Sequence, residues 1–187
     1  MAELLRYCTL DEAEVLPGGA LLRPLRVNRD PRGVLVETLR TDWPELYGPE
    51  LPFAQSYYSR TEPGVARDED RWHSHRRQFD RFVVAAGSVV VVLALPSSDR
   101  RVRLVPLGPD LGDARQVELL IPPGVLHAFL AVGSVPAVLL NSPTRLYDPA
   151  DEGRVPFAEA GATLPSGLPF HWDAVRRDAG VRRIFSG

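Results

Sequence analysis

Three histidines and one aspartate are the residues in this sequence that are best placed for chemistry. His73 and His75 stand two positions apart, Asp80 follows them closely, and His127 comes after the turn-forming Pro-Pro-Gly run at 122–124. Alternate side chains of a strand point to the same face, so one strand can direct both neighbouring imidazoles into one space. Imidazoles and a carboxylate that converge there can hold a divalent metal ion or move protons.

Short apolar runs between Pro and Gly supply the elements that must position these groups. The sequence has 18 Pro and 15 Gly, which leaves little room for long helices. Such a series of short runs favours an antiparallel sandwich or barrel. Strands are expected at residues 21–27, 34–40, 53–59, 81–86, 88–95, 102–107, 116–121, 125–132 and 137–141.

Two helices and one tight turn are also expected. A short helix is predicted to begin within residues 41–44, where Thr and Asp can cap it and Pro suits its first turn. Another is predicted over 172–178. Gly87 divides the Val-rich run at 82–95, which therefore indicates two strands that are joined by a tight turn and buried on both faces.

The composition limits the class of protein. A chain of 187 residues, of which 44% are hydrophobic, is long enough for one well-buried domain. The net charge of -2 gives no electrostatic case for binding nucleic acid or a membrane surface, and no apolar stretch is long enough for a membrane span. All 22 basic residues are Arg, so Lys chemistry is excluded. The lone Cys8 cannot form an internal disulfide, which favours a cytoplasmic protein.

Five short motifs give a more specific indication. In chain order they are Asp30-Pro31-Arg32-Gly33-Val34 with Glu37, Phe53-Ala54-Gln55 with Ser59, Gly64-Val65-Ala66-Arg67, Ile121-Pro122-Pro123-Gly124 with His127, and Leu146-Tyr147-Asp148-Pro149 with Glu152. Together with the histidine run, this series resembles the cupin superfamily and, within it, the dTDP-4-dehydrorhamnose 3,5-epimerase family. The order and approximate spacing agree with that family over 25–178.

The resemblance implies a fold, an activity and an assembly. It implies an all-β cupin double-stranded β-helix, or jelly roll, with short peripheral helices. The chain would form a single domain, 1–187, with its core at 21–150 and a C-terminal extension at 151–187 that packs on the barrel. The family acts as homodimers, without a metal cofactor, on dTDP-linked 4-keto-6-deoxysugars. The implied function is a nucleotide-sugar 4-keto-6-deoxyhexose epimerase or isomerase in deoxysugar or polysaccharide biosynthesis.

The resemblance also assigns roles to single residues. His73 falls on the base that takes a proton from the carbon beside the keto group, and Asp178 falls on the acid that orients this base. Tyr147 falls on a further pocket position and is counted with the catalytic residues. The residues expected to bind the nucleotide sugar are Arg32, Gln55, Arg71, Arg81, His127 and Glu152.

Two catalytic positions of the family carry other residues in this sequence. The Lys that steadies the enolate oxygen falls on Asp80, and the Tyr that returns a proton on the opposite face falls near Leu140. An anion in place of a cation beside a developing enolate raises the barrier by several kcal/mol, unless another positive centre is present. Arg81 would supply that charge if its side chain pointed inward.

Two alternatives therefore stay open. A divalent metal (Zn, Fe, Mn or Ni) held by His73, His75, Asp80 and His127 would polarise a keto oxygen, but it would occupy His73 and prevent it from acting as the base. Alternatively, the chain is a non-catalytic cupin that binds sugar nucleotides without converting them.

Overall fold

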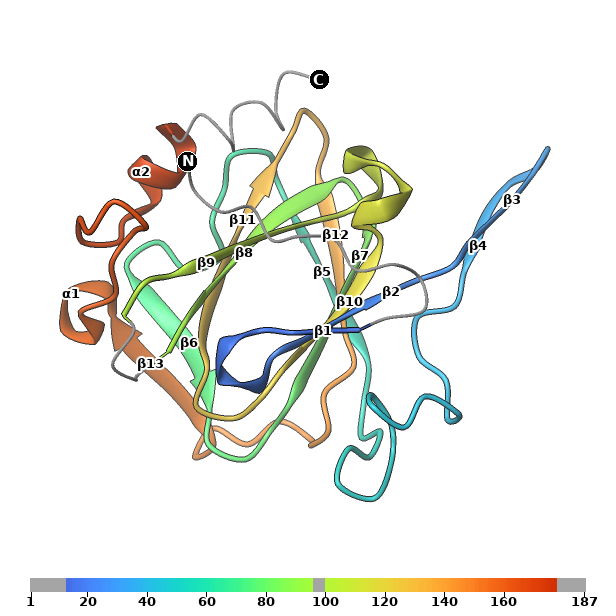
Figure 1. Cartoon of the computed structure of the whole chain (residues 1–187), viewed down its shortest axis with the longest axis horizontal. Coiled ribbons are helices and arrows are strands. Elements are labelled where there is room, and N and C mark those ends of the chain that lie inside the picture. Colours follow the sequence, from blue (N-terminus) through green and yellow to red (C-terminus); the bar gives the residue numbers. More distant parts are fainter. Residues whose placement is uncertain (1–12, 96–99, 178–187) are drawn as a thin grey trace.

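Antiparallel strands make up most of the fold (Figure 1). The structure is a computed structural model, and it describes residues 13–95 and 100–177. Its helices are α1 (Phe157–Ala160) and α2 (Trp172–Arg177). Its strands are β1 (Glu14–Val15), β2 (Leu21–Pro24), β3 (Val27–Asp30), β4 (Gly33–Val36), β5 (Tyr57–Thr61), β6 (Arg71–His75), β7 (Asp80–Ala86), β8 (Ser88–Ala94), β9 (Arg103–Leu107), β10 (Val117–Ile121), β11 (Leu126–Val132), β12 (Ala137–Asn141) and β13 (Glu152–Pro156).

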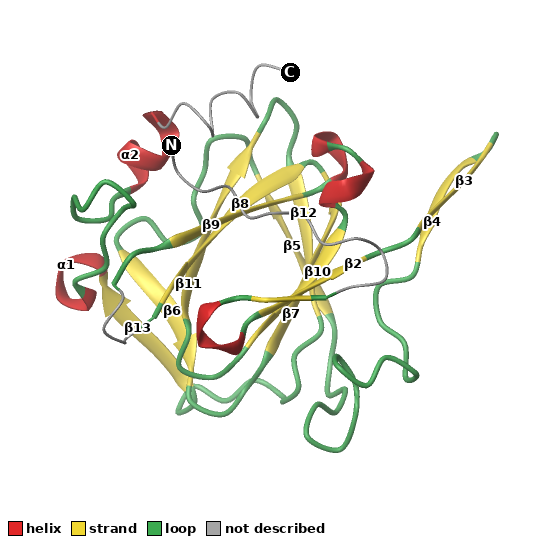
Figure 2. Cartoon of the chain, viewed as in Figure 1, coloured by secondary structure: helices red, strands yellow, loops and turns green. Residues whose placement is uncertain are grey.

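The strands form two sheets and a separate hairpin. One sheet has six strands in the order β1-β2-β10-β7-β12-β5, and the other has five in the order β13-β6-β11-β8-β9. Figure 2 shows these sheets wrapped into a barrel, while the β3–β4 hairpin projects from it. The expected all-β class, with short peripheral helices, is confirmed.

The Val-rich strand β8 is buried on both of its faces. Val89 and Val91 pack into the cluster between the sheets, where Phe82 and Phe129 also lie. Val90 and its alternate neighbours pack into a second cluster, on the outer side of the five-stranded sheet. This alternation follows from the period of two along a strand.

An aromatic cluster covers that outer side. Its members are Trp72 of β6, Phe157 of α1, Phe170, which precedes α2, and Trp172 of α2. In the closest pairs, their ring centroids are 4.6–5.2 Å apart. The two helices and the segment between them therefore pack on the sheet through large apolar side chains. No helix in the described ranges is long and apolar enough to cross a membrane.

Gly87 makes the tight turn between β7 and β8. Its φ is +66°, and a Cβ at this position would lie 2.6 Å from the carbonyl oxygen of Pro136. Any other residue would therefore be strained here. The turn directs β7 into one sheet and β8 into the other.

Three sequence expectations differ from the structure. The segment at 41–44 forms turns and no helix, because Gly48 and Pro49 follow within one turn and cannot extend it. The strand expected at 53–59 is observed as β5, which begins four residues later and ends two residues later. Strand β13 was absent from the expected series, since it has no run of apolar residues, and β6 was expected only from the alternation of His73 and His75.

Candidate active site

The barrel brings the three histidines and Asp80 together between its sheets. His73 and His75 lie on β6 and His127 on β11, and His73 is the direct cross-strand partner of His127. Asp80 begins β7 in the opposite sheet. The ring centroid of His73 lies 4.6 Å from that of His75 and 5.0 Å from that of His127. The four residues singled out in the sequence therefore form one cluster.

The two imidazoles of β6 face each other. The Nε2 atoms of His73 and His75 are 2.9 Å apart, so one proton must lie between them. The Gln78 amide donates a hydrogen bond to Oδ1 of Asp80 at 2.8 Å, and its Nε2 lies 3.0 Å from Nε2 of His75. Asp151 supports this strand from the other side, since its Oδ2 lies 3.4 Å from Nδ1 of His75.

Asp80 is an anion enclosed by hydrogen-bond donors. It is 2% exposed, and Oδ1 accepts hydrogen bonds of 2.8 Å from the amides of Gln78 and Asn141. Its Oδ2 lies 3.3 Å from Nε2 of His127 and 3.4 Å from Nε2 of His75. Burial opposes ionisation, but His127, His75 and Asn141 outweigh it and lower the pKa of Asp80 to about 2. Asp80 is therefore ionised at neutral pH.

His73 is held in its neutral form. Burial, and then the charges of His127, His75 and Arg154, lower the pKa of His73 to about 3. A neutral imidazole can accept a proton, which is the state that a general base requires.

Glu152 is the acid beside His73 in the described structure. Its Oε1 lies 3.6 Å from Nδ1 of His73, and it pairs with Arg154. The sequence predicted Glu152 as a ligand-contacting residue and Asp178 as the acid that orients the base. Asp178 lies outside the described residues, and Glu152 stands where an orienting acid would.

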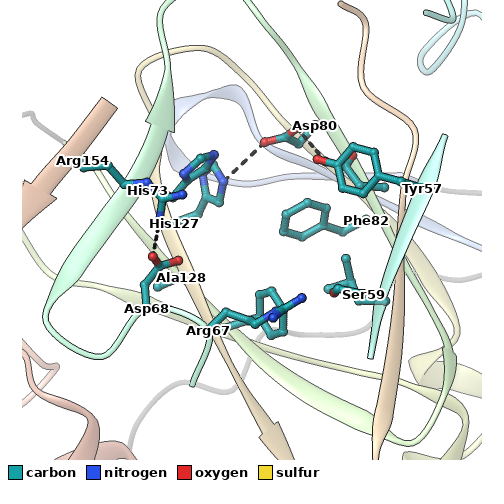
Figure 3. A pocket seen from close by; sticks show the side chains of 13 residues that line it. Tyr57, Ser59, Arg67, Asp68, His73, Asp80, Phe82, His127, Ala128 and Arg154 are labelled. Carbon is teal, nitrogen blue, oxygen red and sulfur yellow. Dashed lines mark hydrogen bonds and ion pairs between the residues drawn. The ribbon is translucent and has the colours of Figure 1, made fainter. Parts of the chain in front are cut away.

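A pocket of about 310 Å³ opens beside this cluster (Figure 3). Side chains of both sheets and of the loop before β6 line it: Tyr57, Ser59, Arg67, Asp68, His73, Asp80, Phe82, His127, Ala128, Phe129, Leu139, Asn141 and Arg154. The volume suits a sugar ring. Arg67 and Arg154 are the two guanidinium groups in this lining.

Tyr57 and Asn141 were not predicted as site residues. They are cross-strand partners on β5 and β12, and the Asn141 amide donates a hydrogen bond of 2.8 Å to the phenolic oxygen of Tyr57. Tyr57 stands midway between Gln55 and Ser59 of the sequence motif. Alternation along a strand therefore puts the side chains of Tyr57 and Ser59 on the same face. The sequence predicts a pocket position near Leu140, the neighbour of Asn141. The structure places Leu139 and Asn141 in the pocket lining, and Leu140 outside it.

The expectation that Arg81 points into the pocket is wrong. Arg81 follows Asp80 on β7, so its side chain lies on the opposite, outer face of the sheet, where it is 1% exposed. Its guanidinium donates hydrogen bonds to the carbonyl oxygens of Leu46, Leu51 and Ser142, at 2.8, 2.6 and 2.7 Å. Arg81 therefore fastens the segment before β5 to the barrel and offers no charge to a ligand.

Other predicted ligand residues also lie away from the pocket lining of this chain. Arg71 pairs with its neighbour Asp70 at 2.7 Å and is not among the residues that line the pocket. Gln55 donates a hydrogen bond of 3.2 Å to the carbonyl oxygen of Arg145, and Tyr147 is 70% exposed on a loop. Arg32 stands at the tip of the β3–β4 hairpin and pairs with Asp30.

The histidine cluster has donor atoms that suit a metal. Single ligand atoms of His73, His75 and Asp80 all lie within 4.8 Å of one another. His127 is not part of that group, although its Nε2 faces Asp80. Two imidazoles and a carboxylate are a common set for Zn, Fe or Mn.

Comparison with known proteins identifies the family. The model of the dTDP-4-dehydrorhamnose 3,5-epimerase family matches residues 15–179. The probable low-salt glycan biosynthesis epimerase Agl13 of Haloferax volcanii is 39% identical over 139 residues, which are 73% of this chain and 85% of that protein.

Solved structures agree with this match. NovW, a 4-keto-6-deoxy sugar epimerase from the novobiocin gene cluster of Streptomyces spheroides, has a TM-score of 0.67 and 25% identity over 94% of both chains. RmlC of Legionella pneumophila, a dTDP-6-deoxy-D-glucose-3,5-epimerase solved with dTDP-4-keto-L-rhamnose, has a TM-score of 0.65 and 21% identity over 82% of this chain and 83% of that one. The chain has the cupin jelly roll of these enzymes and belongs to the dTDP-4-dehydrorhamnose 3,5-epimerase family of sugar-nucleotide epimerases and isomerases.

Proposed function

We propose that the pocket beside His73 epimerises a dTDP-linked 4-keto-6-deoxyhexose, with His73 as the base, in deoxysugar or polysaccharide biosynthesis. The observation that carries this proposal is a partly buried, neutral imidazole in the wall of a sugar-sized pocket. The substrate class comes from NovW and from the ligand of the Legionella enzyme.

The chemistry required is proton abstraction beside a carbonyl group. A base must take the proton from carbon, and positive charge must balance the enolate oxygen that forms. His73 is neutral and can take the proton. The negative charge of the enolate then stabilises the imidazolium, which offsets the low proton affinity of His73 in the empty pocket.

Positive charge for the enolate or the diphosphate comes from the pocket lining. Arg67 and Arg154 lie there, whereas the sequence resemblance assigns Asp80 to the position of the family's Lys. Arg154 already pairs with Asp68 and Glu152. Arg67 has no ion pair or hydrogen bond of its side chain among the described residues, so we propose it as the partner of the substrate's negative charge.

His73→Asn tests the role of the base. We expect wild-type protein in D₂O to incorporate deuterium into dTDP-4-keto-6-deoxyglucose at a carbon beside the keto group. The variant should lose this exchange by about 100-fold or more, because its amide cannot accept the proton. His171→Asn is the matched control, since His171 is exposed at the start of α2. Exchange by His73→Asn at the wild-type rate would remove His73 from the mechanism.

A second candidate is a metal-dependent reaction at the same cluster. The Nε2 atoms of His73 and His75 are 2.9 Å apart, and Oδ2 of Asp80 is 3.4 Å from His75. Ligands bound to one metal at about 2.1 Å are separated by similar distances. A metal would act as a Lewis acid on the keto oxygen, and His73 would then be a ligand.

The assembly and location complete the proposal. We propose a cytoplasmic homodimer in which the β3–β4 hairpin meets a second copy of the chain. The hairpin projects from the barrel (Figure 1), and its Val34 and Leu35 are 54% and 62% exposed. Arg32 at its tip would then reach substrate only in the neighbouring copy. The lone Cys8 supports a reducing compartment, and subcellular fractionation tests it.

A further inference from the structure

Inversion at a carbon requires two groups on opposite faces of the substrate. One face loses its proton to the base, and the other receives a proton from an acid. His73 lies on β6 of the five-stranded sheet, whereas Tyr57 lies on β5 of the six-stranded sheet. Figure 3 shows their side chains on opposite sides of the pocket, and both line it.

The orientation of Asn141 determines what Tyr57 can donate. Oδ1 of Asn141 accepts a hydrogen bond of 3.0 Å from the backbone N–H of Arg81, which fixes the amide. Its Nδ2 then donates to Oδ1 of Asp80 and to the phenolic oxygen of Tyr57, each at 2.8 Å. Because that oxygen is an acceptor, the hydroxyl hydrogen of Tyr57 must point elsewhere, and no other described residue accepts it.

The guanidinium and hydroxyl groups of the lining are poorer acids, and the Asp68 carboxylate pairs with Arg154. Arg67 and Arg154 cannot be deprotonated in proteins, and an aliphatic hydroxyl such as that of Ser59 is a far weaker acid than a phenol. The nitrogens of His127 face the Val125 carbonyl oxygen, at 3.1 Å, and Asp80. Tyr57 lines the pocket and is 50% exposed as a residue.

We propose that Tyr57 is the catalytic acid that protonates the carbon on the face opposite His73, an inference that rests on the proposed function. The C–H bond breaks, its proton goes to His73, and its electron pair forms the enolate. The enolate collapses as a new C–H bond forms with the proton of Tyr57. Asn141 holds the phenolate by its hydrogen bond, and water returns a proton to Tyr57 and takes one from His73. No proton is gained or lost overall.

Tyr57→Phe separates inversion from exchange. With dTDP-4-keto-6-deoxyglucose in D₂O, His73 still removes and returns a proton on its own face. We therefore expect deuterium incorporation within a few-fold of wild type and loss of the inverted product by about 100-fold or more, both measured by NMR. Tyr58→Phe is the matched control, because Tyr58 is 72% exposed on the other face of β5 and should behave as wild type.

The outcomes distinguish this inference from the proposed function. If wild type exchanges no deuterium, the proposed function fails and the role of Tyr57 fails with it. If wild type exchanges and inverts, and Tyr57→Phe forms inverted product at the same rate, only the role of Tyr57 is overturned. Joint loss of exchange and inversion in a folded Tyr57→Phe would make Tyr57 a binding residue, which also overturns it. Circular dichroism establishes that the variant is folded.

Discussion

At the scale of single residues, Asp80 decides between the two reactions that the site can support. The carboxylate is 2% exposed and is surrounded by donors from Gln78, Asn141 and the imidazoles. Lys at this position would place a second set of donors against these groups and would bury an unpaired charge, at a cost of about 3–5 kcal/mol. The family's Lys therefore cannot simply be restored here, because the network around position 80 is built for an anion.

Asp80→Asn is the informative change. It keeps the shape of the side chain but puts an N–H₂ group where a carboxylate oxygen faces donors, so the free energy of unfolding should fall by about 1–3 kcal/mol. Urea denaturation measures this loss. In the metal-free reaction, deuterium exchange persists in EDTA for both wild type and the variant.

The metal content of the same two proteins tests the alternative. A metal held by His73, His75 and Asp80 would be present in wild type in about equimolar amount, and it would be reduced in Asp80→Asn because one ligand is lost. Loss of exchange after EDTA treatment and its return with added Zn or Mn would contradict the metal-free mechanism. Glu62→Gln, an exposed carboxylate on the barrel, serves as the control.

At the scale of elements, the sequence predicted the strands that carry their own apolar pattern. Strand β8 was predicted because Val occupies both of its faces. Strand β13 was missed because Glu-Gly-Arg-Val-Pro has no such pattern, and pairing with β6 alone makes it a strand. The histidine cluster was predicted from alternation, whereas Asn141 and Glu152 acquire their roles only from partners distant in sequence. Alternation also shows that Asp80 and Arg81 cannot both face the pocket.

Glu118 of β10 gives the element-scale prediction. It lies on the outer face of the six-stranded sheet, beside Arg23 of β2 and Arg81 of β7, and it is 1% exposed. Burial raises the pKa of Glu118 to about 8, although the charges of Arg81 and Arg23 oppose the shift. A raised pKa means that folding favours the protonated acid. Its stabilising effect is full below about pH 4.5 and is lost as the pH rises to about 8.

Glu118→Gln keeps the neutral shape at every pH. At pH 9 the variant should exceed wild type in free energy of unfolding by on the order of 2–4 kcal/mol, and at pH 4 the two should agree within about 1 kcal/mol. Urea denaturation at both pH values measures the difference. Glu50→Gln, at an exposed position in the loop before β5, should show no such dependence. Parallel pH profiles for wild type and Glu118→Gln would contradict the raised pKa.

At the scale of the whole molecule, packing within the barrel accounts for the stability of the barrel but not for that of the projecting hairpin. The two sheets bury their shared face, and the helices cover the outer side of one of them. The β3–β4 hairpin has two strands that pair only with each other in the described structure. An isolated two-stranded hairpin is marginal in water, so its projecting form needs a further surface to pack on. A second copy supplies one in the proposed homodimer.

Charges on the hairpin test the dimer. Val34→Asp with Leu35→Asp places two carboxylates where the proposed interface is apolar, so the double variant should be monomeric by light scattering at concentrations at which wild type is a dimer. Because the change lies outside the barrel core, the near-UV spectrum should be unchanged. Val135→Asp with Leu168→Asp is the control, since both residues are exposed apolar groups elsewhere on the molecule. A wild-type monomer, or a double variant that remains dimeric, would contradict the hairpin interface.

If the dimer also delivers Arg32 to the neighbouring pocket, then Arg32→Ala should raise the KM for the dTDP-sugar in the dimer by about 10-fold and leave the dimer itself intact.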